Sequence, residues 1–159
     1  MTDLDMIEKA PIEGAPSIPL LLVHGAWHGA WCWEGFQDYL SENGVRSFAV
    51  NLRGHGGRPC VTSLRWTRLK EYVDDVSQAF EIIKKNTGIS PVVVGHSMGG
   101  LVVQKFLESR SEVPMAILLA SVPPQGVWRT TMDIALHHPL DFLMVNLSLS
   151  LWPLVNSET

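Results

Sequence analysis

Four short runs made wholly or mostly of apolar residues constrain the fold more than any other feature of the sequence. They cover residues 18–23, 45–50, 91–94 and 115–120, of which the second includes Arg46 and Ser47. A strand with one face in water alternates apolar and polar residues, whereas an uninterrupted apolar run is typical of a strand buried on both faces of a parallel sheet. We therefore expect the four runs to be buried strands of one mostly parallel sheet.

Segments with helical periodicity separate these runs. A short helix is expected at residues 33–40, closed by Asn43-Gly44. Apolar residues recur at three- and four-residue steps from Leu69 to Ile83, which predicts an amphipathic helix with Thr67 as its N-cap and Gly88 as its stop. A third helix should run from Met98 to about Ser109.

Strands that alternate with helices at this spacing predict right-handed crossovers. The expected fold class is α/β, a mostly parallel sheet with helices on both faces. The pattern breaks at residues 122–126 (V-P-P-Q-G) and no further strand is expected after it. We expect residues 1–125 to form the sheet-bearing part, and 126–159 to be a helical apolar segment that another part of a protein, or a lipophilic ligand, covers.

Composition excludes several classes of function. Twelve Lys+Arg against sixteen Asp+Glu give a formal net charge of −4, which argues against a nucleic-acid partner. The first residues show no basic and apolar leader, and the apolar stretch at 139–155 is too short and too interrupted for a membrane span. Cys32 and Cys60 are too few for a disulfide scaffold, so we expect reduced thiols and a cytoplasmic location. The sequence does not predict an oligomeric state.

The segment Gly95-His96-Ser97-Met98-Gly99 carries the clearest chemistry. It is a G-x-S-x-G motif between an expected strand and an expected helix, the context of a nucleophile elbow. A sharp turn there strains Ser97 and exposes its Oγ, while the glycines remove Cβ atoms that would collide where strand and helix cross. Ser97 is the predicted nucleophile, and the backbone N–H of Met98 is free to meet a developing oxyanion.

Other interpretations of this segment carry less weight. A Gly-Ser-Gly turn could simply join two elements, but the sequence on both sides matches the motif's context. His96 stands next to Ser97, yet neighbouring residues on a tight turn project apart. We therefore interpret His96 as a packing residue and expect the general base from another loop.

Three motifs taken together resemble the α/β-hydrolase superfamily: Leu22–Trp27 (L-V-H-G-A-W), Asn51–Gly56 (N-L-R-G-H-G) and the segment around Ser97. The run at 28–33 (H-G-A-W-C-W) is similar to the plant methylesterase and hydroxynitrile lyase branch. A serine at position 97 excludes the sister groups with an aspartate nucleophile. The superfamily usually has Asp at the position of Asn51, and we expect this departure to alter loop hydrogen bonding rather than chemistry.

The resemblance implies a function and a site. It implies a serine hydrolase that cleaves a carboxylic ester of a lipophilic small molecule through an acyl-serine intermediate, without metal or cofactor. The N–H groups of Ala26 and Met98 would form the oxyanion hole, and Trp27 would contact substrate. His24 and His28 are expected to orient backbone rather than transfer protons.

The resemblance also implies a general base and a carboxylate on later loops, in the order Ser, Asp/Glu, His. Because the chain ends before such loops, we expect it to be the amino-terminal part of a longer hydrolase, with residues 126–159 as the start of a cap. We interpret Asp133, His137, His138 and Asp141 as solvated cap residues and expect the 159 residues alone to be inactive. A hydroxynitrile-lyase-like or haloperoxidase-like enzyme and a non-catalytic binding module remain open.

Overall fold

The computed structural model describes residues 4–12, 17–60, 64–140 and 142–143. The chain divides into two compact units, Met1–Pro124 and Gln125–Thr159, which are described separately.

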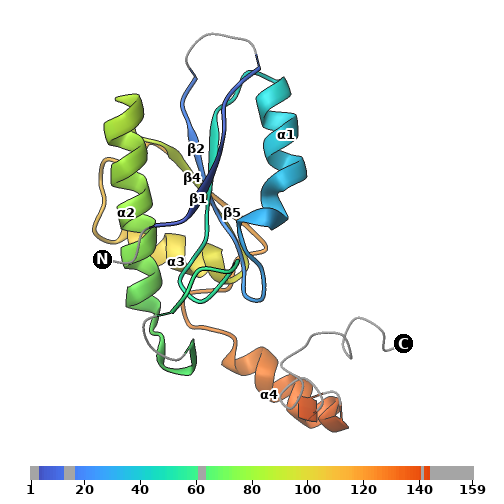
Figure 1. Ribbon diagram of the computed structural model, residues 1–159. Helices are drawn as coiled ribbons and strands as arrows, with labels where there is room; N and C mark the ends of the chain where they lie inside the picture. The colour runs from blue at the N-terminus through green and yellow to red at the C-terminus, as the bar shows by residue number, and fades with distance from the viewer. Residues whose placement is uncertain (1–3, 13–16, 61–63, 141, 144–159) are drawn as a thin grey trace. The chain divides into compact units, whose positions relative to one another are not determined.

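The first unit is built on a five-stranded sheet with the order β1-β3-β2-β4-β5 (Figure 1). Strands β2 (Leu20–Val23), β3 (Ser47–Val50), β4 (Val92–His96) and β5 (Ala116–Leu119) correspond to the four apolar runs and are mutually parallel. The remaining strand, β1 (Met6–Lys9), pairs antiparallel with β3 at the sheet's edge. The prediction of a mostly parallel sheet is confirmed, but the predicted burial is wrong for β5, an edge strand whose residues Ile117, Leu118 and Leu119 are 38% to 43% exposed.

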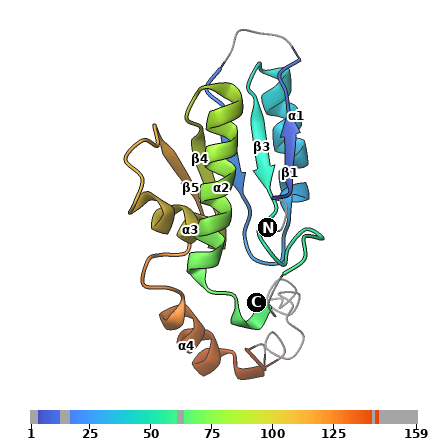
Figure 2. The same ribbon diagram turned by 60° about the vertical axis from the view of Figure 1, so that its left-hand side comes forward.

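Helices cover both faces of this sheet, as predicted (Figures 1 and 2). A 3₁₀ turn, η1 (Ala30–Trp33), leads into α1 (Glu34–Glu42) on one face. On the other face α2 (Leu69–Thr87), which follows the short 3₁₀ turn η2 (Leu64–Trp66), packs beside α3 (Met98–Leu107). The chain therefore has an α/β fold.

Alternate residues of the central strands enter two different cores. Leu21 and Val23 of β2 pack with α2 and α3, whereas Leu22 between them packs with η1 and α1. Neighbouring strands follow the same alternation, with Val93 on the first side and Val94 on the second. Because both faces are buried, both sets of residues are apolar, which explains why the strands appear in the sequence as continuous runs.

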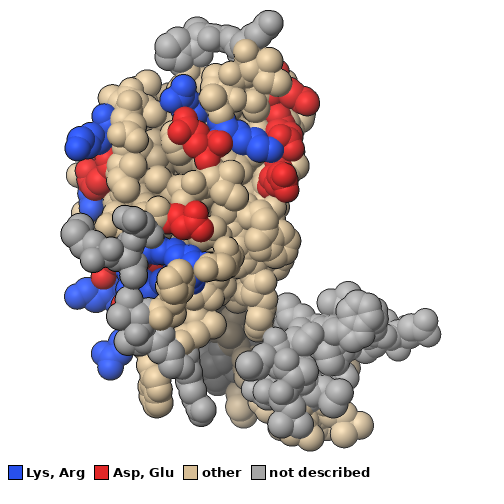
Figure 3. Space-filling model, viewed as in Figure 1, with Lys and Arg blue, Asp and Glu red and all other residues tan. Residues whose placement is uncertain are grey.

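Strand β1 was absent from the predicted elements. Only Met6 packs against the larger core, while the side chains of Ile7 and Glu8 are exposed, so the strand leaves no apolar run in the sequence. Its charged side chains form ion pairs instead. Lys9 pairs with Asp38, and Glu8 pairs with Arg46, just before β3, at 3.3 Å. Figure 3 shows acidic and basic side chains interspersed over this part of the first unit.

The predicted N-cap of α2 is wrong by one residue. Arg68 is the N-cap, and the carboxylate of Glu71 accepts a hydrogen bond from the Arg68 backbone N–H at 2.8 Å. The hydroxyl of Thr67 lies 3.2 Å from the sulfur of Cys60 and does not cap the helix. At the other end, Gly88 has φ +73° and stops the helix as predicted.

The second unit contains the helix α4 (Trp128–His137). Helical structure after residue 126 agrees with the sequence pattern. Most of the apolar stretch at 139–155 lies outside the described residues. In the part of the chain that the structure describes, no helix is long and apolar enough to cross a membrane.

Candidate active site

Ser97 lies at the junction between the end of β4 and the start of α3. Its backbone has φ +53° and ψ −119°, a left-handed conformation that a residue with a Cβ adopts only at a cost of about 1–3 kcal/mol. Hydrogen bonds hold it there. The Ser97 N–H donates to the carbonyl of Leu119 at 3.0 Å, and the Ser97 carbonyl accepts from the N–H groups of Gly100 at 3.0 Å and Val122 at 3.1 Å.

The glycines of the motif allow α3 to approach the sheet closely. A Cβ at Gly99 would lie 2.4 Å from the carbonyl oxygen of His24 and 2.5 Å from that of Val23. A Cβ at Gly95 would lie 2.7 Å from the carbonyl oxygen of Gly99. Larger residues would therefore push the helix away from the strands and move Ser97.

The loop that follows β2 lies directly beside this elbow. A Cβ at Gly25 would be 3.0 Å from the Cβ of Ser97, so only glycine fits there without a shift. Trp27 in the same loop has φ +60°, a strained value for a residue with a side chain. Among the described residues, no hydrogen bond occupies the N–H of Ala26 or Met98, or the Oγ of Ser97.

His24 is fully buried at the start of this loop. One ring nitrogen, Nδ1, is 2.7 Å from the carbonyl oxygen of Gly25, and the other, Nε2, accepts a hydrogen bond from the N–H of Leu52 at 3.2 Å. Burial is the main reason that the pKa of His24 falls from 6.5 to about 4. The ring is therefore neutral at physiological pH, and it orients backbone as the sequence predicted.

Asn51 connects three segments around the site. Its Oδ1 accepts a hydrogen bond from the Ala30 N–H at 2.6 Å, and its Nδ2 donates to the Asp5 carboxylate at 2.7 Å. Gly56 packs against it so closely that a Cβ there would lie 1.9 Å from Oδ1. An aspartate at position 51 could not donate to Asp5, so the departure from the family pattern does change loop hydrogen bonding.

Asp75 fixes the loop after β3 to α2. It is 1% exposed, and its carboxylate accepts hydrogen bonds from the Arg53 guanidinium at 2.8 and 3.0 Å and pairs with Arg58 at 3.2 Å. The hydrogen bonds that the Arg53 guanidinium donates to Asp75 are the main cause of the raised pKa of Arg53. Sequence analysis missed Asp75, although a carboxylate three residues after Tyr72 on the apolar side of a helix signals a buried ion pair.

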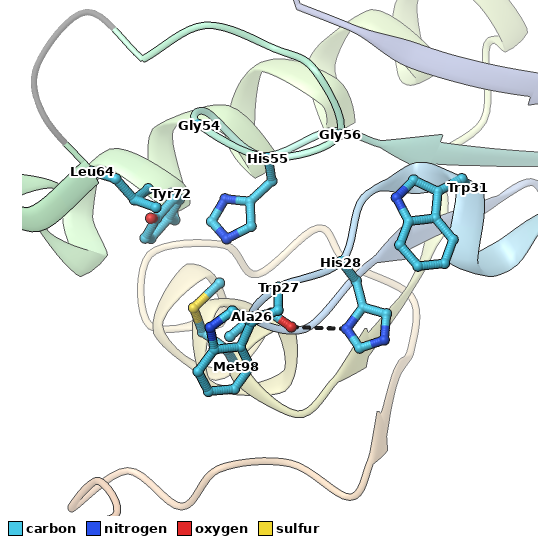
Figure 4. Close-up of a pocket in the computed structure, with 10 residues that line it drawn as sticks. All are labelled: Ala26, Trp27, His28, Trp31, Gly54, His55, Gly56, Leu64, Tyr72 and Met98. Atoms are coloured by element: carbon cyan, nitrogen blue, oxygen red, sulfur yellow. Dashed lines mark hydrogen bonds between the residues drawn. The ribbon is translucent and has the colours of Figure 1, made fainter. Parts of the chain in front are cut away.

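A cleft of about 460 Å³ opens beside the two candidate oxyanion donors (Figure 4). Ala26 and Met98 both line it, whereas Ser97 itself is not among the lining residues. The wall is largely aromatic and apolar with a few polar groups, and it comprises Ala26, Trp27, His28, Trp31, Gly54, His55, Gly56, Leu64, Tyr72 and Met98. Trp27, the predicted substrate contact, is in this wall and is 58% exposed.

The side chains of the described histidines hydrogen-bond or pack against groups other than Ser97. The rings of His28 and His55 approach backbone carbonyls of their own loops, at 2.8 and 3.1 Å, and His96 contacts the ring of Trp33 edge-on. His137 pairs with Asp133 at 3.1 Å on the surface of α4. Among the described residues of the first unit, no histidine hydrogen-bonds Ser97, and within the described ranges no group of three His, Cys, Asp or Glu side chains could hold a metal ion.

The comparisons with known proteins identify the family. The model of the alpha/beta hydrolase family matches residues 20–157. The chain belongs to the alpha/beta hydrolase family. The match covers both the segment around Ser97 and the loop around Ala26, so these motifs lie in the part of the chain that defines membership.

Two relatives of this chain have names that denote different activities. Norfluorocurarine synthase 1 of Strychnos nux-vomica is 31% identical over 112 residues, which are 67% of this chain and 40% of that protein. Methylesterase 1 of Arabidopsis thaliana is 30% identical over 105 residues, which are 65% of this chain and 39% of that protein.

A solved structure gives the same fold. The monoacylglycerol lipase of Paleococcus ferrophilus matches with a TM-score of 0.61 and 21% identity, over 86% of this chain and 52% of that one. At this identity the likeness concerns the fold alone. The chain spans about half, or less than half, of the length of these three proteins.

Proposed function

We propose that the protein is a serine hydrolase that cleaves a carboxylic ester through an acyl-Ser97 intermediate. The observation that carries the proposal is the strained backbone of Ser97, at φ +53°, beside two backbone N–H groups without partners among the described residues. A serine in such a turn has its hydroxyl presented for attack, and unpaired amides suit a developing oxyanion. Methylesterase relatives support an ester as the substrate.

In the proposed first step, the Oγ of Ser97 attacks the ester carbonyl carbon. A new C–O bond forms, and the carbonyl oxygen takes a negative charge that the N–H groups of Ala26 and Met98 stabilise. The C–O bond to the alcohol then breaks. The proton of the Ser97 hydroxyl passes through a general base to the departing alcohol, and water later releases the acid by the reverse sequence. We expect that base, with its carboxylate, to lie outside the described residues.

The cleft supports a lipophilic substrate. Trp27, Trp31, Leu64 and Met98 give it an apolar wall, and the first three of these side chains are 48% to 58% exposed. Covering such surface with a lipophilic acyl or alcohol group contributes about 25 cal/mol for each Å² removed from water. The ring nitrogens of His28 and His55 provide polar contacts in the same wall.

A fluorophosphonate probe tests the proposed nucleophile. The protein, expressed from its complete coding sequence, should be labelled on the tryptic peptide 86–105, which contains both Ser90 and Ser97. Ser97→Ala should abolish labelling, whereas Ser90→Ala is the matched control and should leave it intact. Absence of labelling in the wild-type protein, or labelling that survives Ser97→Ala, would refute the proposal.

A second candidate keeps the same serine but changes the chemistry. One relative is named a synthase rather than an esterase, which supports a reaction other than ester hydrolysis at this serine. The second candidate is such a reaction, hydroxynitrile-lyase-like or haloperoxidase-like. A panel of aryl esters and cyanohydrins distinguishes the two, because only the proposed esterase turns over the esters. Binding of both without turnover would instead support a non-catalytic module.

A further inference from the structure

We propose that His24 is a positioning residue that sets the direction of the Ala26 N–H in the oxyanion hole. The inference rests on the proposed function for its catalytic consequence. Its structural basis is the pair of hydrogen bonds at the two ring nitrogens of His24.

The hydrogen-bond partners of His24 determine its tautomer. The backbone N–H of Leu52 is a donor, so Nε2, 3.2 Å away, must be an unprotonated acceptor. The single proton of the neutral ring is then on Nδ1. Nδ1 is 2.7 Å from the carbonyl oxygen of Gly25 and donates to it. The loop after β3 therefore fixes the tautomer through Leu52, and the tautomer in turn fixes the Gly25 carbonyl.

The Gly25 carbonyl and the Ala26 N–H belong to one peptide group. In a planar trans peptide the two point in opposite directions, so a hydrogen bond that orients the carbonyl also orients the N–H. Position 25 needs this restraint, because glycine allows the peptide plane to rotate more freely than any other residue. A side chain cannot supply it, since a Cβ there would lie 3.0 Å from the Cβ of Ser97.

The next peptide group is held in the same way. The Nδ1 of His28 is 2.8 Å from the carbonyl oxygen of Ala26. The two restraints keep Trp27 at φ +60°, a conformation that the loop would otherwise tend to leave. His28 lies in the wall of the cleft, whereas His24 is fully buried and is not part of that wall, although its ring centroid lies 5.3 Å from that of His55, which is. A substitution at His24 therefore tests the restraint with less change to the wall than a substitution at His28.

Two substitutions separate the two hydrogen bonds of His24. The amide nitrogen of Asn reaches about as far as Nδ1, so His24→Asn keeps the donor to Gly25 and loses the acceptor for Leu52. The amide oxygen of Gln reaches about as far as Nε2, so His24→Gln keeps the acceptor and loses the donor. Both variants should lose stability. Only His24→Gln should also misdirect the Ala26 N–H.

The kinetic readout is ester hydrolysis and the rate of fluorophosphonate labelling, measured on the complete protein. Removal of one oxyanion donor lowers kcat by about 10²–10³-fold, so we expect His24→Gln to lower kcat by roughly tenfold or more with KM unchanged. His24→Asn should retain most of kcat. Equal losses in the two variants, or losses that follow their unfolding free energies, would overturn the proposal.

A second measurement is independent of activity and uses the 159-residue chain. Nitrogen-15 NMR of the His24 ring should show a protonated Nδ1 and an unprotonated Nε2, and the reverse would overturn the proposal. The Ala26 amide nitrogen shift, which responds to hydrogen bonding at the preceding carbonyl, should move in His24→Gln and stay in His24→Asn. An inert wild-type protein would refute the proposed function, but these spectra would still decide the role of His24.

Discussion

Because the ring of His24 is buried, the free energy of unfolding should depend on pH by an amount that can be worked out. Its pKa falls from 6.5 to about 4 in the folded protein. Between these two values the unfolded chain binds a proton at this site and the folded protein does not. Stability should therefore fall as the pH is lowered through this window, and at about 1.4 kcal/mol per pKa unit the loss due to His24 is about 3 kcal/mol.

Urea unfolding of the 159-residue chain at pH 7 and pH 4 measures this loss. Carboxylates also titrate near the acid end of the window, so His24→Asn, which cannot titrate, is the reference. The substitution should destabilise the protein at pH 7, and this loss of unfolding free energy should be about 3 kcal/mol smaller at pH 4. The reason is that only the wild-type protein is destabilised at pH 4 by protonation of His24 in its unfolded state. An equal cost at the two pH values would refute the argument that His24 is held neutral by burial.

Three further substitutions test the supports of the site by the change in unfolding free energy. Asn51→Asp should cost about 1–3 kcal/mol, since it places a second carboxylate against Asp5 and loses the donor to it, and an added Asp5→Asn should recover part of this. Gly99→Ala should destabilise because its Cβ would lie 2.4 Å from a carbonyl oxygen, whereas Gly35→Ala, with nothing within 4 Å, should stabilise by up to about 1 kcal/mol. Asp75→Asn should cost about 3–5 kcal/mol because it leaves two arginines without their buried carboxylate, and a loss below 1 kcal/mol would contradict that.

The sequence predicted those parts of the fold where burial leaves a local pattern. The continuous runs at β2 and β4 are visible because residues such as Leu21 and Leu22 enter opposite cores. Strand β1 is held by backbone pairing with β3 and by paired surface charges, neither of which leaves a period in the sequence. It was therefore missed.

In the candidate site, too, some features follow from a local sequence pattern and others do not. The strained turn at Ser97 follows from the spacing of its flanking glycines, and the structure has it. The hydrogen bond from Leu52 to His24 joins residues 28 apart in the chain, and that from Asn51 to Asp5 joins residues 46 apart. Such contacts depend on where two loops meet at the end of the sheet, which no local pattern encodes.

We propose that Ser97 attacks a carbonyl group whose oxygen is stabilised by the backbone N–H groups of Ala26 and Met98. A crystal structure of the protein after reaction with a fluorophosphonate tests it most directly. We predict phosphorus bonded to the Oγ of Ser97 and a phosphonyl oxygen within hydrogen-bond distance of the N–H groups of both Ala26 and Met98. An adduct on another residue, or a phosphonyl oxygen turned away from both amides, would contradict the account.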